Sequence, residues 1–291
     1  MFGAQVKYFR AFKPLRSEHA VKRVIRLSSD PTRISAQHGF ASGDYVTELE
    51  LCLVAIAALL GSAITAVAGL GGGILLLSVL LQFLDPLEAI PIHAVIQLVS
   101  NSSRAVILRD DVDWVVVKRF SLLLLPAGLA GLLVAGAFPV AVGRIFIAIF
   151  ALLLVWWPQG LKGLTVFLGT GRRTFIPLGA IAGFLNIPFG VTGPAIAPVF
   201  RAELPTRTAM IATFAMAQTL GHLAKIILFA GDGFAYWDQL ALLGIGITAV
   251  LVGTWLGTRL LKKLSEVIFG HLFRCALTVI SLRVIISAAL D

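Results

Sequence analysis

The chain has 291 residues, of which 58% are hydrophobic and only 13% are charged, and its mean hydropathy is +0.94. Because so few polar side chains remain to cover a water-facing surface, this composition excludes an ordinary soluble globule and favours a membrane protein. The formal net charge is +9, and it is unevenly distributed along the chain.

Residues 1–45 form a basic N-terminal tail with eight Lys/Arg against three Asp/Glu. The positive-inside rule predicts that such a tail stays in the cytoplasm, where it contacts anionic lipid. No nucleic-acid recognition motif accompanies the charge, so we predict no nucleic-acid partner. No long apolar stretch follows the charges within the tail, so it does not resemble a cleaved signal peptide.

Eight apolar blocks follow the tail, and most of them have the length of one membrane crossing. About 20 residues at 1.5 Å each cover a hydrocarbon core of about 30 Å, and a helix satisfies its own backbone in lipid. The sequence therefore predicts an all-α polytopic membrane protein. The blocks span residues 46–84, 89–108, 114–137, 140–158, 174–200, 208–230, 238–258 and 266–288.

Two of these blocks contain glycine and proline at a density that stops a helix. The first is cut by Gly69-Leu70-Gly71-Gly72-Gly73, and the fifth is cut between Asn186 and Pro194. Unwound backbone at membrane depth survives only where protein or a water-filled cavity satisfies it. We therefore expect broken or re-entrant helices in both blocks.

The chain repeats itself at an offset of 121 residues, which brings the two breaks into register. Gly69 meets Gly190 and Gly72 meets Gly193, and in the following blocks Gln97, Asn101 and Arg104 meet Gln218, His222 and Lys225. This ordered set indicates a duplication with halves at 46–165 and 166–291, which we expect to form an inverted repeat. Matching breaks in two halves are typical of the binding site of a secondary transporter.

The physical chemistry of the two breaks predicts an anion site. A helix that starts in mid-membrane presents unpaired N–H groups and the positive end of its dipole, and glycine lets a ligand approach the backbone. The alternative is that glycines serve close helix packing, which we expect for Gly253 and Gly257. The backbone candidates for substrate binding are Gly69, Gly71, Gly72, Gly73, Gly190, Thr192 and Gly193.

Polar side chains follow one face of the second and sixth blocks. His93, Gln97, Asn101 and Arg104 are spaced by four, four and three residues, and Gln218, His222 and Lys225 repeat the pattern. Such groups inside membrane helices normally face a cavity, a partner or a substrate, and a cationic lining implies an anionic ligand. We count Gln97, Asn101, Arg104, Gln218 and His222 among the substrate-binding candidates.

Each of these side chains also has a structural interpretation. Arg104 and Lys225 can extend to the lipid headgroups, and the amides can join helices to one another. His93 and His222 are either carriers of a coupling proton or ordinary core histidines.

Enzymatic and metal chemistry find little support in the sequence. The cysteines, Cys52 and Cys275, lie in apolar stretches without metal-ligand spacing, and neither a GxSxG nor an HExxH motif occurs. We therefore predict no enzyme activity, no cofactor and no metal.

The paired motifs resemble those of the TauE/SafE sulfite exporter family. The likeness rests on Gly69-Leu70-Gly71-Gly72-Gly73, on Asn101-Ser102-Ser103, and on Gly190-Val191-Thr192-Gly193-Pro194, and it covers about residues 46–290. The resemblance implies a multi-pass protein of the bacterial inner membrane, built as two homologous halves, that moves sulfite, sulfonates or related organosulfur anions. A proline often follows the first glycine cluster in such proteins, whereas here Leu77 and Ser78 stand there and only Pro198 keeps it.

The sequence as a whole predicts a secondary transporter for a small sulfur-containing oxyanion, working by alternating access. An anion channel is the alternative, and an intramembrane enzyme is less favoured. The basic tail places the N-terminus in the cytoplasm, and loop charges favour a re-entrant fifth block. The substrate's organic part, the direction of transport, the coupling ion and a homodimeric state are left open.

Overall fold

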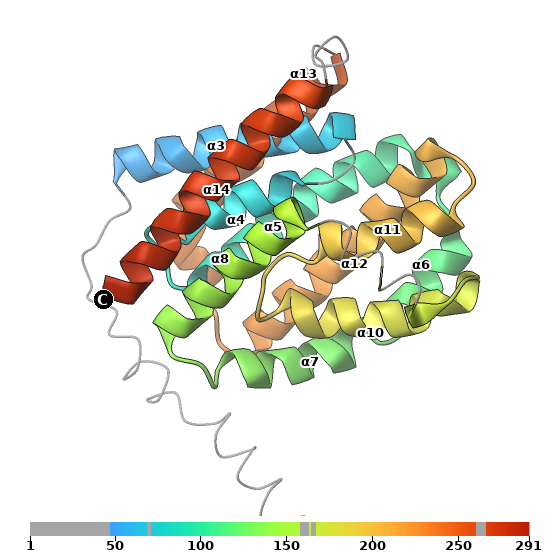
Figure 1. Ribbon diagram of the computed structural model, residues 1–291, viewed down its shortest axis with the longest axis horizontal. Coiled ribbons are helices and arrows are strands. Elements are labelled where there is room, and N and C mark those ends of the chain that lie inside the picture. The colour runs from blue at the N-terminus through green and yellow to red at the C-terminus, as the bar shows by residue number, and fades with distance from the viewer. Residues whose placement is uncertain (1–46, 69–70, 158–162, 164–166, 260–265, 291) are drawn as a thin grey trace, which may run out of the picture. The chain divides into compact units, whose positions relative to one another are not determined.

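The computed structural model describes residues 47–68, 71–157, 163, 167–259 and 266–290 (Figure 1). These residues are helical or lie in turns and connections, with no strand among them. The predicted all-α class is confirmed for this part of the chain. The expected basic tail at 1–45 and Gly69 lie outside the described residues.

The helices follow one another in the order that the apolar blocks suggest. The first half of the chain holds α3 (Glu48–Ala68), α4 (Gly72–Leu80), α5 (Pro86–Ile107), η1 (Arg109–Asp111), α6 (Trp114–Ser121), α7 (Leu124–Ala135) and α8 (Val140–Trp156). The second half holds η2 (Arg172–Thr174), α10 (Phe175–Asn186), α11 (Gly193–Glu203), α12 (Arg207–Gly231), η3 (Tyr236–Gln239), α13 (Leu240–Arg259) and α14 (Glu266–Leu290).

Three described stretches are long and apolar enough to cross a membrane, namely Glu48–Ala66, Arg207–Gly231 and Tyr236–Gly257. A fourth results if the bent pair α6 and α7 is counted as one span. The 22-residue helix α5 is not among them, because its polar face lowers its hydropathy. The composition and these helices together describe a multi-pass membrane protein.

Both predicted breaks are confirmed. Helix α3 ends at Ala68 and α4 begins at Gly72, while α10 ends at Asn186 and α11 begins at Gly193. Pro194 lies within the first turn of α11, where its missing N–H removes no helical hydrogen bond. The first and fifth blocks are therefore each two helices.

A third break, between α6 and α7, was not predicted from the sequence. The block at 114–137 is bent by 40° there. Pro126, in the first turn of α7, has no N–H to offer the carbonyl of Leu122, so no helical hydrogen bond joins these two residues across the bend. The bend allows α7 to pack along α10 (Figure 1).

Glycines allow the closest helix contacts outside the two predicted breaks. A Cβ atom at Gly257 would lie 2.7 Å from the backbone oxygen of Ala63, and one at Gly253 would meet the backbone oxygen of Leu59. The interpretation of these two glycines as packing residues is confirmed. They hold α13 against α3, while α5 packs against α12 and α8 packs against α14.

Candidate functional site

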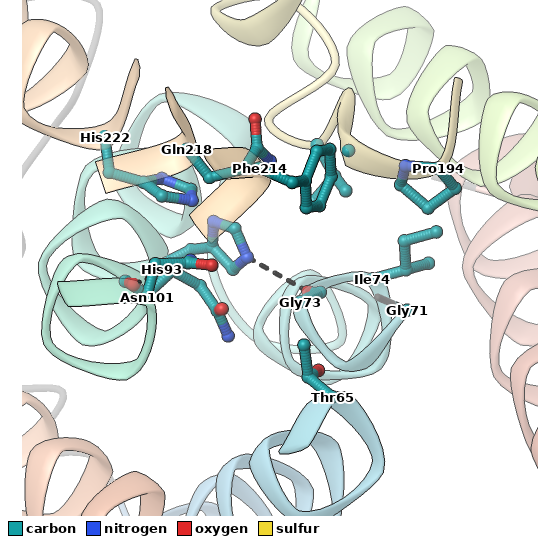
Figure 2. Close-up of a pocket in the computed structure, with 13 residues that line it drawn as sticks. Thr65, Gly71, Gly73, Ile74, His93, Asn101, Pro194, Phe214, Gln218 and His222 are labelled. Atoms are coloured by element: carbon teal, nitrogen blue, oxygen red, sulfur yellow. Dashed lines mark hydrogen bonds between the residues drawn. The ribbon is translucent and has the colours of Figure 1, made fainter. Parts of the chain in front are cut away.

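The two broken segments meet at one pocket in the interior of the protein (Figure 2). Its volume is about 30 Å³, measured as the space open to the centre of a water molecule, which is room for more than one water. Five helices and both breaks contribute to the wall. The lining residues are Thr65, Gly71, Gly73, Ile74, His93, Gln97, Asn101, Val191, Gly193, Pro194, Phe214, Gln218 and His222.

The first break is shaped by a left-handed residue and by one hydroxyl group. Gly71 has φ of 106°, a conformation that side-chain-bearing residues rarely adopt. The backbone N–H of Gly72 donates to Oγ1 of Thr65 over 3.0 Å, and that hydroxyl donates to the backbone oxygen of Gly61 over 2.8 Å. One unpaired N–H at the start of α4 is therefore satisfied by α3 and is not free for a ligand.

Gly72 itself faces helix α3 and does not line the pocket. A Cβ atom there would collide with the backbone oxygen of Gly61 and with the Thr65 hydroxyl. The two neighbouring glycines, Gly71 and Gly73, do line the pocket. Gly72 therefore serves the close approach of α3 and α4, whereas its neighbours expose backbone to the cavity.

The second break is held by a buried lysine. Gly190 is also left-handed, with φ of 70°, and its backbone oxygen accepts a hydrogen bond from Nζ of Lys225 over 2.6 Å. The backbone oxygen of Thr192 accepts from the N–H groups of Ala195 and Ile196 in the first turn of α11. Gly190 and Thr192 form the turn behind the pocket, and Gly193 reaches its wall.

Helix α5 contributes a ring, an amide and a hydrogen-bonded polar pair. Nε2 of His93 donates to the backbone oxygen of Gly73 over 3.0 Å, drawn as the dashed line in Figure 2. The amide of Asn101 donates to the backbone oxygen of Gln97 over 2.9 Å and accepts from Nη2 of Arg104 over 2.6 Å. Asn101 thus lines the pocket with its amide already fixed within its own helix.

The side-chain amides of Gln97 and Gln218 are the freest donors in the site. Both line the pocket, one from α5 and the other from α12, and neither amide hydrogen-bonds to another residue in the described part of the chain. An amide presents two N–H donors to a ligand oxygen. These two glutamines are therefore well placed to bind an oxyanion.

Two basic side chains lie behind the pocket wall. The exposed fractions of Arg104 and Lys225 are 5% and 1%, so neither reaches the surface of the protein. This burial corrects the alternative in which both extend to lipid headgroups. Nε and Nη1 of Arg104 have no hydrogen-bond partner among the described residues.

The two histidines lie next to one another across the interface of α5 and α12. Their ring centroids are 5.6 Å apart in an edge-on arrangement, and the exposed fractions are 1% for His93 and 4% for His222. Lys225 interacts electrostatically with both rings. Among the described residues, no Asp or Glu is buried.

The sequence-predicted residues divide into three groups in the structure. Seven line the pocket: Gly71, Gly73, Gln97, Asn101, Gly193, Gln218 and His222. Four lie behind its wall: Gly72, Arg104, Gly190 and Thr192. Gly69 lies outside the described residues, so its predicted role is untested.

The pocket also contains residues that were not selected from the sequence as binding candidates: Thr65, Ile74, His93, Val191, Pro194 and Phe214. The 121-residue offset could have found some of them, because it maps His93 onto Phe214 and Gly73 onto Pro194. Thr65 is different, since a hydroxyl near the end of an apolar helix carries no distinctive signal. Its role arises only because the chain folds back and brings the N–H of Gly72 to the Thr65 hydroxyl.

Comparison with protein families gives a match over most of the chain. A family model described as sulfite exporter TauE/SafE matches residues 53–284, which include both breaks and every residue of the pocket. Neither the curated proteins nor the solved structures contain a match to the chain.

Proposed function

Since the chain belongs to the TauE/SafE sulfite exporter family, we propose that it carries a small sulfur-containing oxyanion across the membrane through the pocket between its two breaks. Membrane transport of a sulfur anion is the function that the family implies. The compact pocket suits sulfite itself or the head group of a small sulfonate. Membership also favours a transporter over an intramembrane enzyme, and the proposed transport step uses no metal ion or cofactor.

The imbalance of buried charge is the observation that carries the proposal. Arg104, Lys225, His93 and His222 are buried around one pocket, and no buried carboxylate among the described residues offsets them. Buried basic groups are costly unless an opposite charge joins them. A bound anion supplies that charge, and the amides of Gln97 and Gln218 donate to its oxygens.

The proposed transport cycle is alternating access between halves at 46–165 and 166–291, arranged as an inverted repeat. The helix starts support this duplication, because α4 and α11 begin 121 residues apart, as do α5 and α12. The packing is also reciprocal: α3 contacts α13 of the other half, and α10 contacts α6 and α7. Rocking of one half against the other would open the pocket to each side in turn.

The membrane is proposed to be the bacterial inner membrane, with the N-terminus in the cytoplasm. The support is the family together with the excess of Lys/Arg over Asp/Glu in residues 1–45. Contact of this tail with anionic lipid is part of the same proposal.

The test compares substitutions at two glycines. Each variant is reconstituted into proteoliposomes, and the uptake of labelled sulfite is measured. Gly193→Val places a side chain in the pocket wall, where a Cβ atom would lie 2.9 Å from Nε2 of Gln218. The control is Gly244→Val, because a Cβ atom there would meet nothing within 4 Å. We expect uptake to fall at least about tenfold in the first variant only.

Both proteins must elute as folded, monodisperse species for this comparison. Undiminished sulfite uptake by a folded Gly193→Val protein would contradict the proposed site. Saturation of uptake with rising sulfite concentration supports a carrier, whereas single-channel currents would support an anion channel.

A further inference from the structure

The hydrogen bonding of His93 determines which of its ring nitrogens is left for further chemistry. Nε2 lies 3.0 Å from the backbone oxygen of Gly73, and a carbonyl oxygen only accepts, so Nε2 carries the hydrogen. In a neutral ring, Nδ1 then carries a lone pair. That atom is buried and has no partner among the described residues.

His222 repeats this feature from the opposite helix. Its Nδ1 is also buried without a partner in the described part of the chain, and its ring lines the same pocket at 5.6 Å from that of His93. Buried polar atoms are nearly always paired in native proteins, so two orphaned nitrogens in one pocket require an explanation. A ligand oxygen that shares a proton with one of these nitrogens is such an explanation.

The charged groups around the pair decide when it accepts a proton. Lys225 on α12 acts on both rings, and Arg104 on α5 acts on His222. The other elements that line the pocket, α3, α4 and α11, contribute no titratable side chain to it. The neighbouring cations would repel a positive charge on either ring, and an anion in the pocket would offset that repulsion.

We propose that the His93–His222 pair takes up one proton when the oxyanion binds, so that each anion crosses the membrane together with a proton. The proton comes from solution and binds Nδ1 of one ring, and the new N–H donates to an oxygen of the anion. Only one ring is charged, because two imidazolium ions at this separation repel each other. This inference rests on the proposed transport of an oxyanion through the pocket.

The test measures protons taken up during sulfite binding. Sulfite is titrated into purified protein at about pH 8, where free imidazole is mostly neutral, in two buffers of different ionisation enthalpy. Calorimetry then gives the number of protons bound per anion. We expect about one proton per sulfite for the wild type, because the pair titrates as a unit.

The variant His93→Gln/His222→Gln separates the histidines from other proton acceptors. We expect it to bind sulfite about tenfold more weakly and to take up no proton. Proton uptake that persists in this variant would overturn the proposal, because the proton would then reside on the anion or on Lys225. The matched control is His271→Gln, an exposed position on α14, which should bind and take up protons like the wild type.

A measurement on the wild type covers the case in which the double variant fails to fold. ¹⁵N NMR of histidine-labelled protein distinguishes imidazole from imidazolium. Sulfite should convert one histidine to the imidazolium form, and binding without that change would overturn the proposal. Absence of any sulfite binding by the wild type would contradict the transport function itself, which is a different result from binding without a proton.

Discussion

Nζ of Lys225 donates a hydrogen bond to the backbone oxygen of Gly190 over 2.6 Å, so a buried basic side chain of α12 anchors the second break. Lys225 is 1% exposed, and Gly190 has a left-handed backbone. One contact therefore fixes the turn that leads into α11 and places a basic group behind the pocket. The structural and electrostatic roles of this lysine are inseparable in the native protein.

The first prediction concerns Lys225→Met. The substitution keeps the length of the side chain but leaves the Gly190 oxygen unpaired, which costs about 1–3 kcal/mol of stability. It also removes a buried amino group, whose desolvation destabilises the folded protein. We expect the free energy of unfolding to change by less than about 2 kcal/mol, because these effects oppose each other. Sulfite uptake by proteoliposomes should fall at least about tenfold.

The control for this prediction is Lys118→Met, since Lys118 is exposed on α6. It should keep wild-type uptake and stability. A folded Lys225→Met protein with wild-type uptake would show that the buried charge is dispensable for transport.

The second prediction concerns the hydroxyl that joins α3 to α4. Thr65→Val removes the donor to the oxygen of Gly61 and the acceptor for the N–H of Gly72 without changing the shape of the side chain. Leaving such buried groups unpaired should lower the free energy of unfolding by about 1–3 kcal/mol. Denaturant unfolding of the detergent-solubilised protein measures the change.

Thr248→Val is the matched control for Thr65→Val. The Thr248 hydroxyl donates only to the oxygen of Gly244, four residues earlier in its own helix, and it is exposed. We expect a change below about 0.5 kcal/mol there. Equal effects of the two substitutions would contradict the bridging role assigned to Thr65.

The third prediction separates a packing glycine from the pocket glycines. In Gly72→Ala the new methyl group collides with the backbone oxygen of Gly61, which cannot rotate away as a side chain does. We expect the yield of folded protein to fall severalfold by size-exclusion chromatography, in line with a cost of more than about 2 kcal/mol. Gly244→Ala, with open space around it, should express like the wild type, and normal folding of Gly72→Ala would refute the close α3–α4 contact.

The fourth prediction concerns the amide of Gln218. Gln218→Leu keeps the bulk of the side chain but removes the N–H donors offered to an oxyanion. The loss of one hydrogen bond to a charged ligand, about 1.5–3 kcal/mol, should weaken sulfite binding by about tenfold or more. Calorimetric titration of sulfite measures the dissociation constant.

Thr219→Val is the control for Gln218→Leu, because its hydroxyl bonds the oxygen of Ala215 within α12 and it does not line the pocket. It should bind sulfite as the wild type does. If Gln218→Leu binds with unchanged affinity, the amide does not contact the anion.

Several features depend on local composition and could therefore be predicted without the structure. The membrane class follows from hydropathy, and the breaks at Gly71 and Gly190 follow from the conformational demands of glycine and proline. The polar helix faces that contain Gln97 and Gln218 follow from helical spacing. These predictions hold because each depends on residues that are neighbours along one helix.

The packing of helices that are distant in the sequence selects which of these residues share a pocket. It brings α4 and α11 to one cavity, places Arg104 and Lys225 behind its wall, and assigns Gly72 to packing against Gly61. The bend between α6 and α7 is a similar case, since a proline permits a kink without dictating its use. A glycine or a basic residue either lines the pocket or holds two helices together, depending on which helix lies opposite it. The distance to that helix is set by the packing of the whole chain.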